Sequence, residues 1–169
     1  MCFYYSDDNG LKETLSFLRI GLDSPAELCV LFADSSRFKD LLGWLSEGYD
    51  GELEALVASG KLALIPGAPT LDELTSSIVG RLDEAMSQGF SVIRFLGFIG
   101  WGKPGWPDEQ ALLEFERRVN EVVTSYPAVI ICTYGVPTLP GAALIYGGLQ
   151  THPVTMIGGN IRDNPHYLP

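Results

Sequence analysis

The sequence has few of the residues that bind metal ions. Its three cysteines, Cys2, Cys29 and Cys132, form no CxxC pair, and its only histidines are His152 and His166. The closely spaced ligand pairs of structural zinc sites are therefore missing, and we predict neither a metal nor a cofactor. Each cysteine lies in an apolar run, which favours buried, reduced thiols and a cytoplasmic protein.

Basic residues are also scarce. The chain has 11 Lys and Arg against 21 Asp and Glu, a formal net charge of −10. Nucleic acids and anionic membranes are bound through basic faces, so we predict no direct contact with either. No apolar run reaches the roughly 18 residues of a membrane span. The first ten residues, MCFYYSDDNG, lack the basic and apolar regions of a signal peptide.

The glycine-rich loops that bind phosphates are absent as well. The turn after the first expected strand reads SDDNGLKET, without the Gly-Lys-Ser/Thr of a phosphate-binding loop. Asp7 and Asp8 in this turn would repel a phosphate. The sequence also contains neither GxGxxG nor GxSxG. We therefore predict no ATP hydrolysis by the P-loop route.

Apolar runs and helical stripes alternate along the chain. We expect strands over residues 2–5, 27–33, 61–65, 90–99, 128–134 and 154–157. We expect helices over residues 11–22, 35–47, 52–59, 70–88, 108–123 and 140–149. Strands separated by helices of this length predict an α/β fold, a three-layer sandwich around a mostly parallel sheet. We expect one domain over residues 1–169, with the short first and last strands less central than the others.

The expected strand over residues 90–99 is apolar except for Arg94. A guanidinium cannot lose its proton, so an inward-pointing Arg94 needs an acceptor, and we expect Glu116. Trp101 follows the strand among glycines and prolines, which suits a pocket wall. The alternative is a core strand with a surface-bound arginine and packing tryptophans.

Further polar candidates lie in later segments. Glu116 and Asn120 are four residues apart and share one helix face. Tyr134 ends an apolar strand, and His152 precedes the last expected strand. A solvated helix charge, a core-edge ring and a helix-capping histidine are the structural alternatives. The candidate ligand-binding residues are Arg94, Trp101, Glu116, Asn120, Tyr134 and His152.

The order of several motifs resembles a known family. The motifs are FYYSDD, AELCVLFAD, SGKLALI, GFSVIRFLG with a following Trp, LLEFERRVNEVV, YPAVIICTYG, THPVTMIGG and NPHYLP. Together they resemble the MEDS family, the methanogen/methylotroph sensory domain of dichloromethane-metabolism regulators, over nearly the whole chain. The resemblance implies a RecA-like fold with a degenerate P-loop, related to circadian-clock ATPases. It also implies sensing of small hydrocarbon derivatives beside a DNA-binding or kinase module.

Two positions depart from the family's pattern. Members commonly carry a histidine just upstream of the first strand, and this sequence begins at Met1 without one. Members often carry an acidic residue after the glycine of the fourth strand, where this chain has Phe98 after Gly97. No output module is fused to the sequence, so we expect it to act through a partner or as a free-standing or excised sensor.

We therefore expect a non-enzymatic sensory domain that binds a small molecule and signals to a histidine kinase or DNA-binding regulator, with a homodimer as a candidate assembly. Because parallel sheets bind ligands beyond the carboxyl ends of their strands, we expect the ligand between Trp101 and Tyr134. The alternative is a protein-interaction scaffold that has lost nucleotide binding. A third possibility is an enzyme that uses Glu116, His152 or Cys132.

Overall fold

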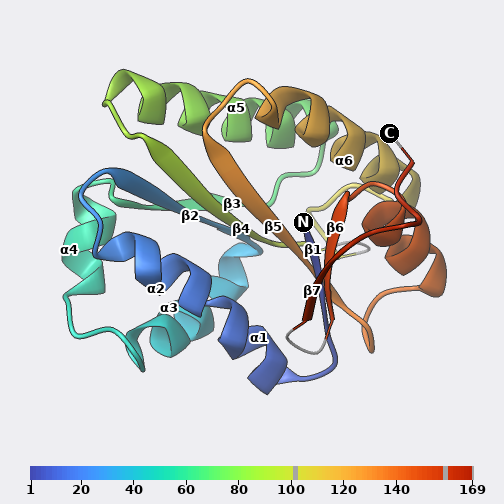
Figure 1. Cartoon of the computed structure of the whole chain (residues 1–169), viewed down its shortest axis with the longest axis horizontal. Helices are drawn as coiled ribbons and strands as arrows, with labels where there is room; N and C mark the ends of the chain where they lie inside the picture. The colour runs from blue at the N-terminus through green and yellow to red at the C-terminus, as the bar shows by residue number, and fades with distance from the viewer. Residues whose placement is uncertain (101–102, 158–159, 169) are drawn as a thin grey trace.

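The computed structural model describes residues 1–100, 103–157 and 160–168. Its centre is a seven-stranded sheet in the order β3-β2-β4-β5-β1-β6-β7 (Figure 1). Neighbouring strands run parallel except β7, which is antiparallel to β6. The strands are β1 (Cys2–Tyr5), β2 (Glu27–Ala33), β3 (Leu62–Pro66), β4 (Val92–Phe98), β5 (Ala128–Gly135), β6 (Val154–Ile157) and β7 (Asn160–Asp163).

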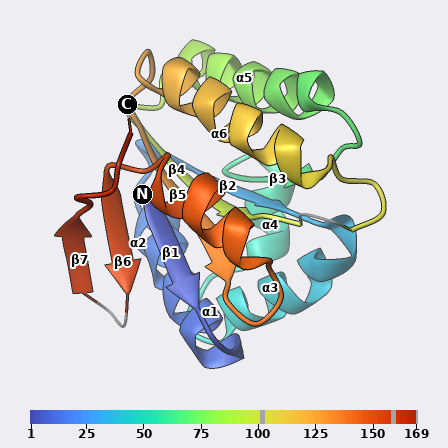
Figure 2. The same cartoon turned by 90° about the vertical axis from the view of Figure 1, so that its right-hand side faces the viewer.

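Helices cover both faces of the sheet, which gives the predicted three-layer α/β sandwich (Figures 1 and 2). One face carries α1 (Asp8–Thr14), α2 (Ser16–Leu22), a short 3-10 turn η1 (Ser35–Arg37), α3 (Phe38–Ser46) and α4 (Leu53–Ala58). The other face carries α5 (Leu71–Ser87), α6 (Glu109–Val123) and a π-helical segment, η2 (Ala143–Leu149).

Each face of the sheet has its own apolar core because strand side chains alternate. In β2, Val30 and Phe32 pack under α5 and α6, whereas Cys29 and Leu31 pack under α1 to α4. All four side chains are buried. The run from Leu28 to Ala33 in β2 is apolar throughout because helices cover both faces of the sheet around it.

The strand order corrects one expectation. β2, β4 and β5 lie inside the sheet as predicted, but the four-residue β1 also lies inside it, between β5 and β6. Its first two residues, Cys2 and Phe3, are buried. The length of a strand limits how many ladder bonds it forms and does not decide its position.

Three further elements differ from the expected ones. The first expected helix divides at Leu15 into α1 and α2. The helix expected over residues 140–149 is the π-helical η2. The tail forms the exposed edge strand β7, which the sequence did not indicate because NIRD has no apolar alternation.

Arg94 has a partner, but not the predicted one. It binds Glu27 on the neighbouring strand β2, and its guanidinium lies 5.1 Å from the ring centroid of Phe17 on α2. Its side chain therefore points toward the layer of α1 to α4, whereas Glu116 on α6 lies over the opposite face. The expected pair of Arg94 and Glu116 is wrong because the two residues belong to different layers.

Among the described residues, none of the helices combines the length and the apolar character that a membrane crossing requires.

Candidate functional site

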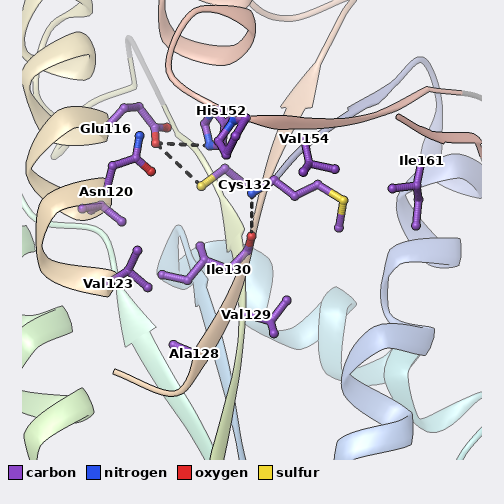
Figure 3. Close-up of a pocket in the computed structure, with 13 residues that line it drawn as sticks. Glu116, Asn120, Val123, Ala128, Val129, Ile130, Cys132, His152, Val154 and Ile161 are labelled. Atoms are coloured by element: carbon purple, nitrogen blue, oxygen red, sulfur yellow. Dashed lines mark hydrogen bonds and ion pairs between the residues drawn. The ribbon is translucent and has the colours of Figure 1, made fainter. Parts of the chain in front are cut away.

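A buried polar cluster lies where α6 and η2 cover the neighbouring strands β5 and β1. Glu116 comes from α6, Cys132 and Tyr134 from β5, and His152 from the turn before β6. Their exposed fractions are 1%, 4%, 0% and 2%. Figure 3 shows Glu116, Cys132 and His152 converging from these three elements.

Local structure explains how these side chains meet. Cys132 and Tyr134 are two residues apart in β5, so they point to the same face of the sheet. Glu116 lies next to Phe115 and within one turn of Val119, both of which pack in the core beneath α6. The carboxylate of Asp108 accepts a hydrogen bond from the Ala111 amide and caps the start of α6.

The Glu116 carboxyl group is held by two donors. The Tyr134 hydroxyl donates to Glu116 Oε1 and also lies 2.9 Å from the carbonyl oxygen of Gly147. The Cys132 thiol donates to Glu116 Oε2 over 3.7 Å. A buried carboxyl group needs such partners, because leaving it without a hydrogen bond would lower the stability of the fold by roughly 1–3 kcal/mol.

The backbone fixes the tautomer of His152. Nδ1 lies 2.8 Å from the carbonyl oxygen of Gly148, and since a carbonyl can only accept, Nδ1 carries the proton. Nε2 of the neutral ring therefore presents a lone pair, and it lies 3.5 Å from Glu116 Oε2. Asn164 secures the same turn by donating to the carbonyl oxygen of His152 over 2.7 Å.

Burial governs the protonation of the cluster. It raises the pKa of Glu116 to about 7, although the hydrogen bond from Tyr134 opposes the shift. Burial also lowers the pKa of His152 to about 3 and raises the pKa of Cys132 well above its usual value. His152 is therefore neutral near pH 7, and its approach to Glu116 is not an ion pair.

A pocket of about 440 Å³ opens beside this cluster, between α6, β5 and the hairpin of β6 and β7 (Figure 3). Glu116, Asn120, Cys132 and His152 supply its polar surface. The remaining lining residues are apolar: Met1, Val119, Val123, Ala128, Val129, Ile130, Pro153, Val154 and Ile161. An apolar pocket of this size with a few convergent polar groups is typical of small-molecule sites.

The structure brings together three of the six predicted site residues in this pocket. Glu116, Asn120 and His152 line it, and Asn120 donates to the Thr151 carbonyl oxygen beside His152. Tyr134 lies behind Glu116 and is completely buried.

The other predicted residues lie elsewhere. Arg94 faces the opposite layer, and Trp101 lies outside the described residues. Cys132, considered only as a possible enzyme residue, belongs to the cluster. The two-residue spacing of Cys132 and Tyr134 could have indicated its place, because alternate residues of a strand point to the same face of the sheet.

The pocket does not lie where the sequence analysis placed the ligand. It adjoins the amino-terminal halves of β5 and β6, not the carboxyl ends of the strands. At the carboxyl ends, the hollow that the described residues form near Asp34, Arg37 and Lys103 holds only about 30 Å³. The Asp7 carboxylate caps the start of α1 by accepting from the Gly10 amide, at the place where a phosphate-binding loop would hold a phosphate.

Fold and site together define an α/β domain with a ligand-sized pocket over a buried polar cluster. The chain belongs to the MEDS family, described as the methanogen/methylotroph, DcmR sensory domain, whose model matches residues 1–153. This confirms the resemblance found in the sequence. The match ends at Pro153, so the hairpin of β6 and β7 lies beyond it. No curated protein matches the chain.

Proposed function

We propose that this sensory domain binds a small, mostly apolar metabolite in the pocket between α6, β5 and the β6–β7 hairpin. The observation that carries the proposal is the pocket itself, about 440 Å³ of space whose apolar walls surround a buried polar cluster. A scaffold that had lost its ligand would be expected to fill such a space with side chains. Membership of a sensory family supports the same conclusion.

The lining indicates the chemistry of the ligand. Val123, Ile130 and Val154 offer only apolar contacts, so most of the ligand should be hydrocarbon. Glu116 and His152 offer polar contacts on one side of the pocket, so one end of the ligand should be polar. A small hydrocarbon derivative, the ligand class that the family resemblance implies, has this form.

We further propose that the domain does not catalyse a reaction. Burial raises the pKa of Cys132, whereas a nucleophilic cysteine has a lowered pKa. The Cys132 thiol donates to Glu116, and the proton of His152 is committed to the Gly148 carbonyl. This arrangement orders a binding surface and does not activate a nucleophile.

The hairpin of β6 and β7 offers a route for the signal. It forms one wall of the pocket through Val154 and Ile161, and β7 is exposed at the edge of the sheet (Figure 2). Ligand contact with this wall would change the surface that a partner meets. We propose a histidine kinase, a DNA-binding regulator or a second copy of the chain as that partner.

A larger hollow of about 820 Å³ lies between α3 and α4. Its polar lining residues, Ser46, Glu52 and Glu54, include two exposed carboxylates, and no buried polar cluster adjoins it among the described residues. Small-molecule sites place a few fixed polar groups against mostly apolar walls. We therefore assign ligand binding to the smaller pocket.

Two exposed isoleucines of the hairpin give a matched test. Ile161 lines the pocket and is 65% exposed, whereas Ile157 is 57% exposed and lies outside its lining. We expect small chlorinated and methylated hydrocarbons to raise the melting temperature of the wild type and of Ile157→Glu. Ile161→Glu places a carboxylate in the apolar wall. This variant should need about tenfold more ligand for the same rise in melting temperature. Equal responses of the two variants would contradict this site.

A further inference from the structure

Three side chains of the polar cluster offer the donor types that Zn²⁺ accepts. Glu116 Oε2, Cys132 Sγ and His152 Nε2 all lie within 4.8 Å of one another and are buried. Oxygen, sulfur and imidazole nitrogen together favour zinc, whereas magnesium and calcium take oxygen ligands only. The three residues come from α6, β5 and the turn before β6, so they do not form a short sequence motif.

Two of the three distances between the donor atoms match those around a tetrahedral ion. Zinc bond lengths at tetrahedral angles place a carboxylate oxygen roughly 3.3–3.5 Å from an imidazole nitrogen and roughly 3.5–3.7 Å from a thiolate sulfur. In the structure, Glu116 Oε2 lies 3.5 Å from His152 Nε2 and 3.7 Å from Cys132 Sγ. The carboxylate oxygen therefore needs almost no movement relative to the other two donors.

The surrounding hydrogen bonds orient the donors as in known metal sites. Nδ1 of His152 donates to the Gly148 carbonyl, so the lone pair of Nε2 faces Glu116 and Cys132. The Tyr134 hydroxyl holds the other oxygen of the Glu116 carboxylate. Partners of this kind fix ring orientation and carboxylate direction in metal centres, where their loss typically weakens binding 10- to 100-fold.

We propose that Glu116, Cys132 and His152 bind one Zn²⁺ through three protein ligands, with the fourth coordination position open to the pocket. On binding, the Cys132 thiol and the protonated fraction of Glu116 release their protons to solvent, and the thiolate and the carboxylate balance the charge of the ion. All three ligands line the pocket, which leaves room for a fourth ligand there. This deepens the proposed function and, in its last part, rests on it: the metabolite is sensed through a polar end group that coordinates the ion.

The metal site is tested with Zn²⁺ and Co²⁺ on chelator-treated protein. We expect one Zn²⁺ per chain by competition with a chromophoric chelator, and a near-ultraviolet thiolate-to-cobalt charge-transfer band with Co²⁺. Cys29 is a matched control, because it is an equally buried strand cysteine on the other face of the sheet. Cys29→Ala should bind as the wild type does, and Cys132→Ala and His152→Gln should bind on the order of 100-fold more weakly.

Two results would overturn the site: wild-type protein without stoichiometric Zn²⁺ binding, or a cobalt complex without the thiolate band. Both use the wild type, so a variant that fails to fold leaves the test intact. Unchanged affinity in folded Cys132→Ala would also overturn it.

The open position is tested with two probes of similar size, 1-butanethiol and 1-chlorobutane. Only the thiol can coordinate the ion, so it alone should change the visible spectrum of the Co²⁺ protein. An unchanged spectrum would refute the open position.

The outcomes separate this inference from the proposed function. If 1-chlorobutane stabilises metal-free protein and Ile161→Glu prevents it, while no metal binds, the sensory pocket stands and the zinc site fails. If Co²⁺ binds through thiolate but neither probe binds, the metal site stands and the open position and the sensory pocket fail.

Discussion

At the scale of single residues, the face on which a side chain lies decides its partner. Arg94 and Glu116 looked like complementary charges in the sequence, yet strand alternation sends Arg94 toward α2 and the packing of α6 sends Glu116 to the opposite layer. Arg94 instead binds Glu27, whose pKa is lowered chiefly by this hydrogen bond. Alternation places Arg94 on the face opposite that of Phe95, which packs beneath α5 and α6.

A double-mutant cycle tests this pairing. Arg94→Met should destabilise the protein by about 1–3 kcal/mol, because it removes a charged hydrogen bond from a half-buried carboxylate. Combining it with Glu27→Gln should recover about 0.5 kcal/mol or more of the summed cost. The measurement is urea unfolding followed by circular dichroism.

Glu116→Gln provides the control for this cycle, since Glu116 lies in the other layer. Its effect should add to that of Arg94→Met within about 0.5 kcal/mol. Coupling of Arg94 to Glu116 but not to Glu27 would contradict the structure.

The sequence predicted part of the site at this scale. The four-residue spacing of Glu116 and Asn120 indicated a shared helix face, and both residues line the pocket. The sequence could not predict that His152 and Cys132 contact Glu116, because these contacts depend on how η2 and α6 pack over β5. Zinc motifs are recognised in a sequence by closely spaced ligands. Here Cys132 lies 16 positions after Glu116, and His152 lies 20 positions after Cys132, so no such motif is present.

At the scale of elements, η2 connects the fold to the site. It packs against α6, and the carbonyl groups of Gly147 and Gly148 hold Tyr134 and His152. Gly148 also lies against the ring of Tyr4, whose hydroxyl donates to the Leu144 carbonyl over 2.7 Å. A side chain at position 148 would separate η2 from β1.

Two glycine-to-alanine substitutions test this close approach. A Cβ on Gly148 would lie 3.0 Å from Tyr4 Cζ and nearer still to the hydroxyl, so Gly148→Ala should destabilise by about 1–3 kcal/mol. Gly80, exposed within α5, has no atom within 4 Å of such a Cβ, and Gly80→Ala should stabilise by about 0.4–1 kcal/mol. Urea unfolding measures the free energy of unfolding of both variants. A change of the same sign in both would contradict the packing of η2.

The sequence predicted elements well where apolar patterning was strong. β2, β4 and β5 and the long helices α5 and α6 occupy nearly the expected ranges, because their core-facing residues recur at the strand or helix period. It failed where tertiary contacts decide: the division of α1 from α2, the π-helical η2 and the polar β7. β7 forms because it pairs with β6, and its own residues are all exposed.

At the scale of the whole molecule, the described residues at the carboxyl edge of the sheet leave little space for a nucleotide, and the turn after β1 lacks a glycine-rich phosphate-binding loop. The Asp7 carboxylate caps α1, and the hollow near Asp34 and Arg37 holds only about 30 Å³. We therefore expect no stabilisation by Mg-ATP or Mg-GTP at millimolar concentration in differential scanning fluorimetry. A saturable rise of several degrees would contradict this expectation.

The central claim is that the pocket beside Cys132 is the ligand site of this sensory domain. Its most direct test is methyl NMR of the wild-type chain, titrated with 1-chlorobutane. We predict saturable shifts of Val123, Ile130 and Val154, which line that pocket, and unchanged signals from Leu42 and Val57, which line the hollow between α3 and α4. Shifts confined to Leu42 and Val57, or no saturable shift at Ile130, would contradict the account.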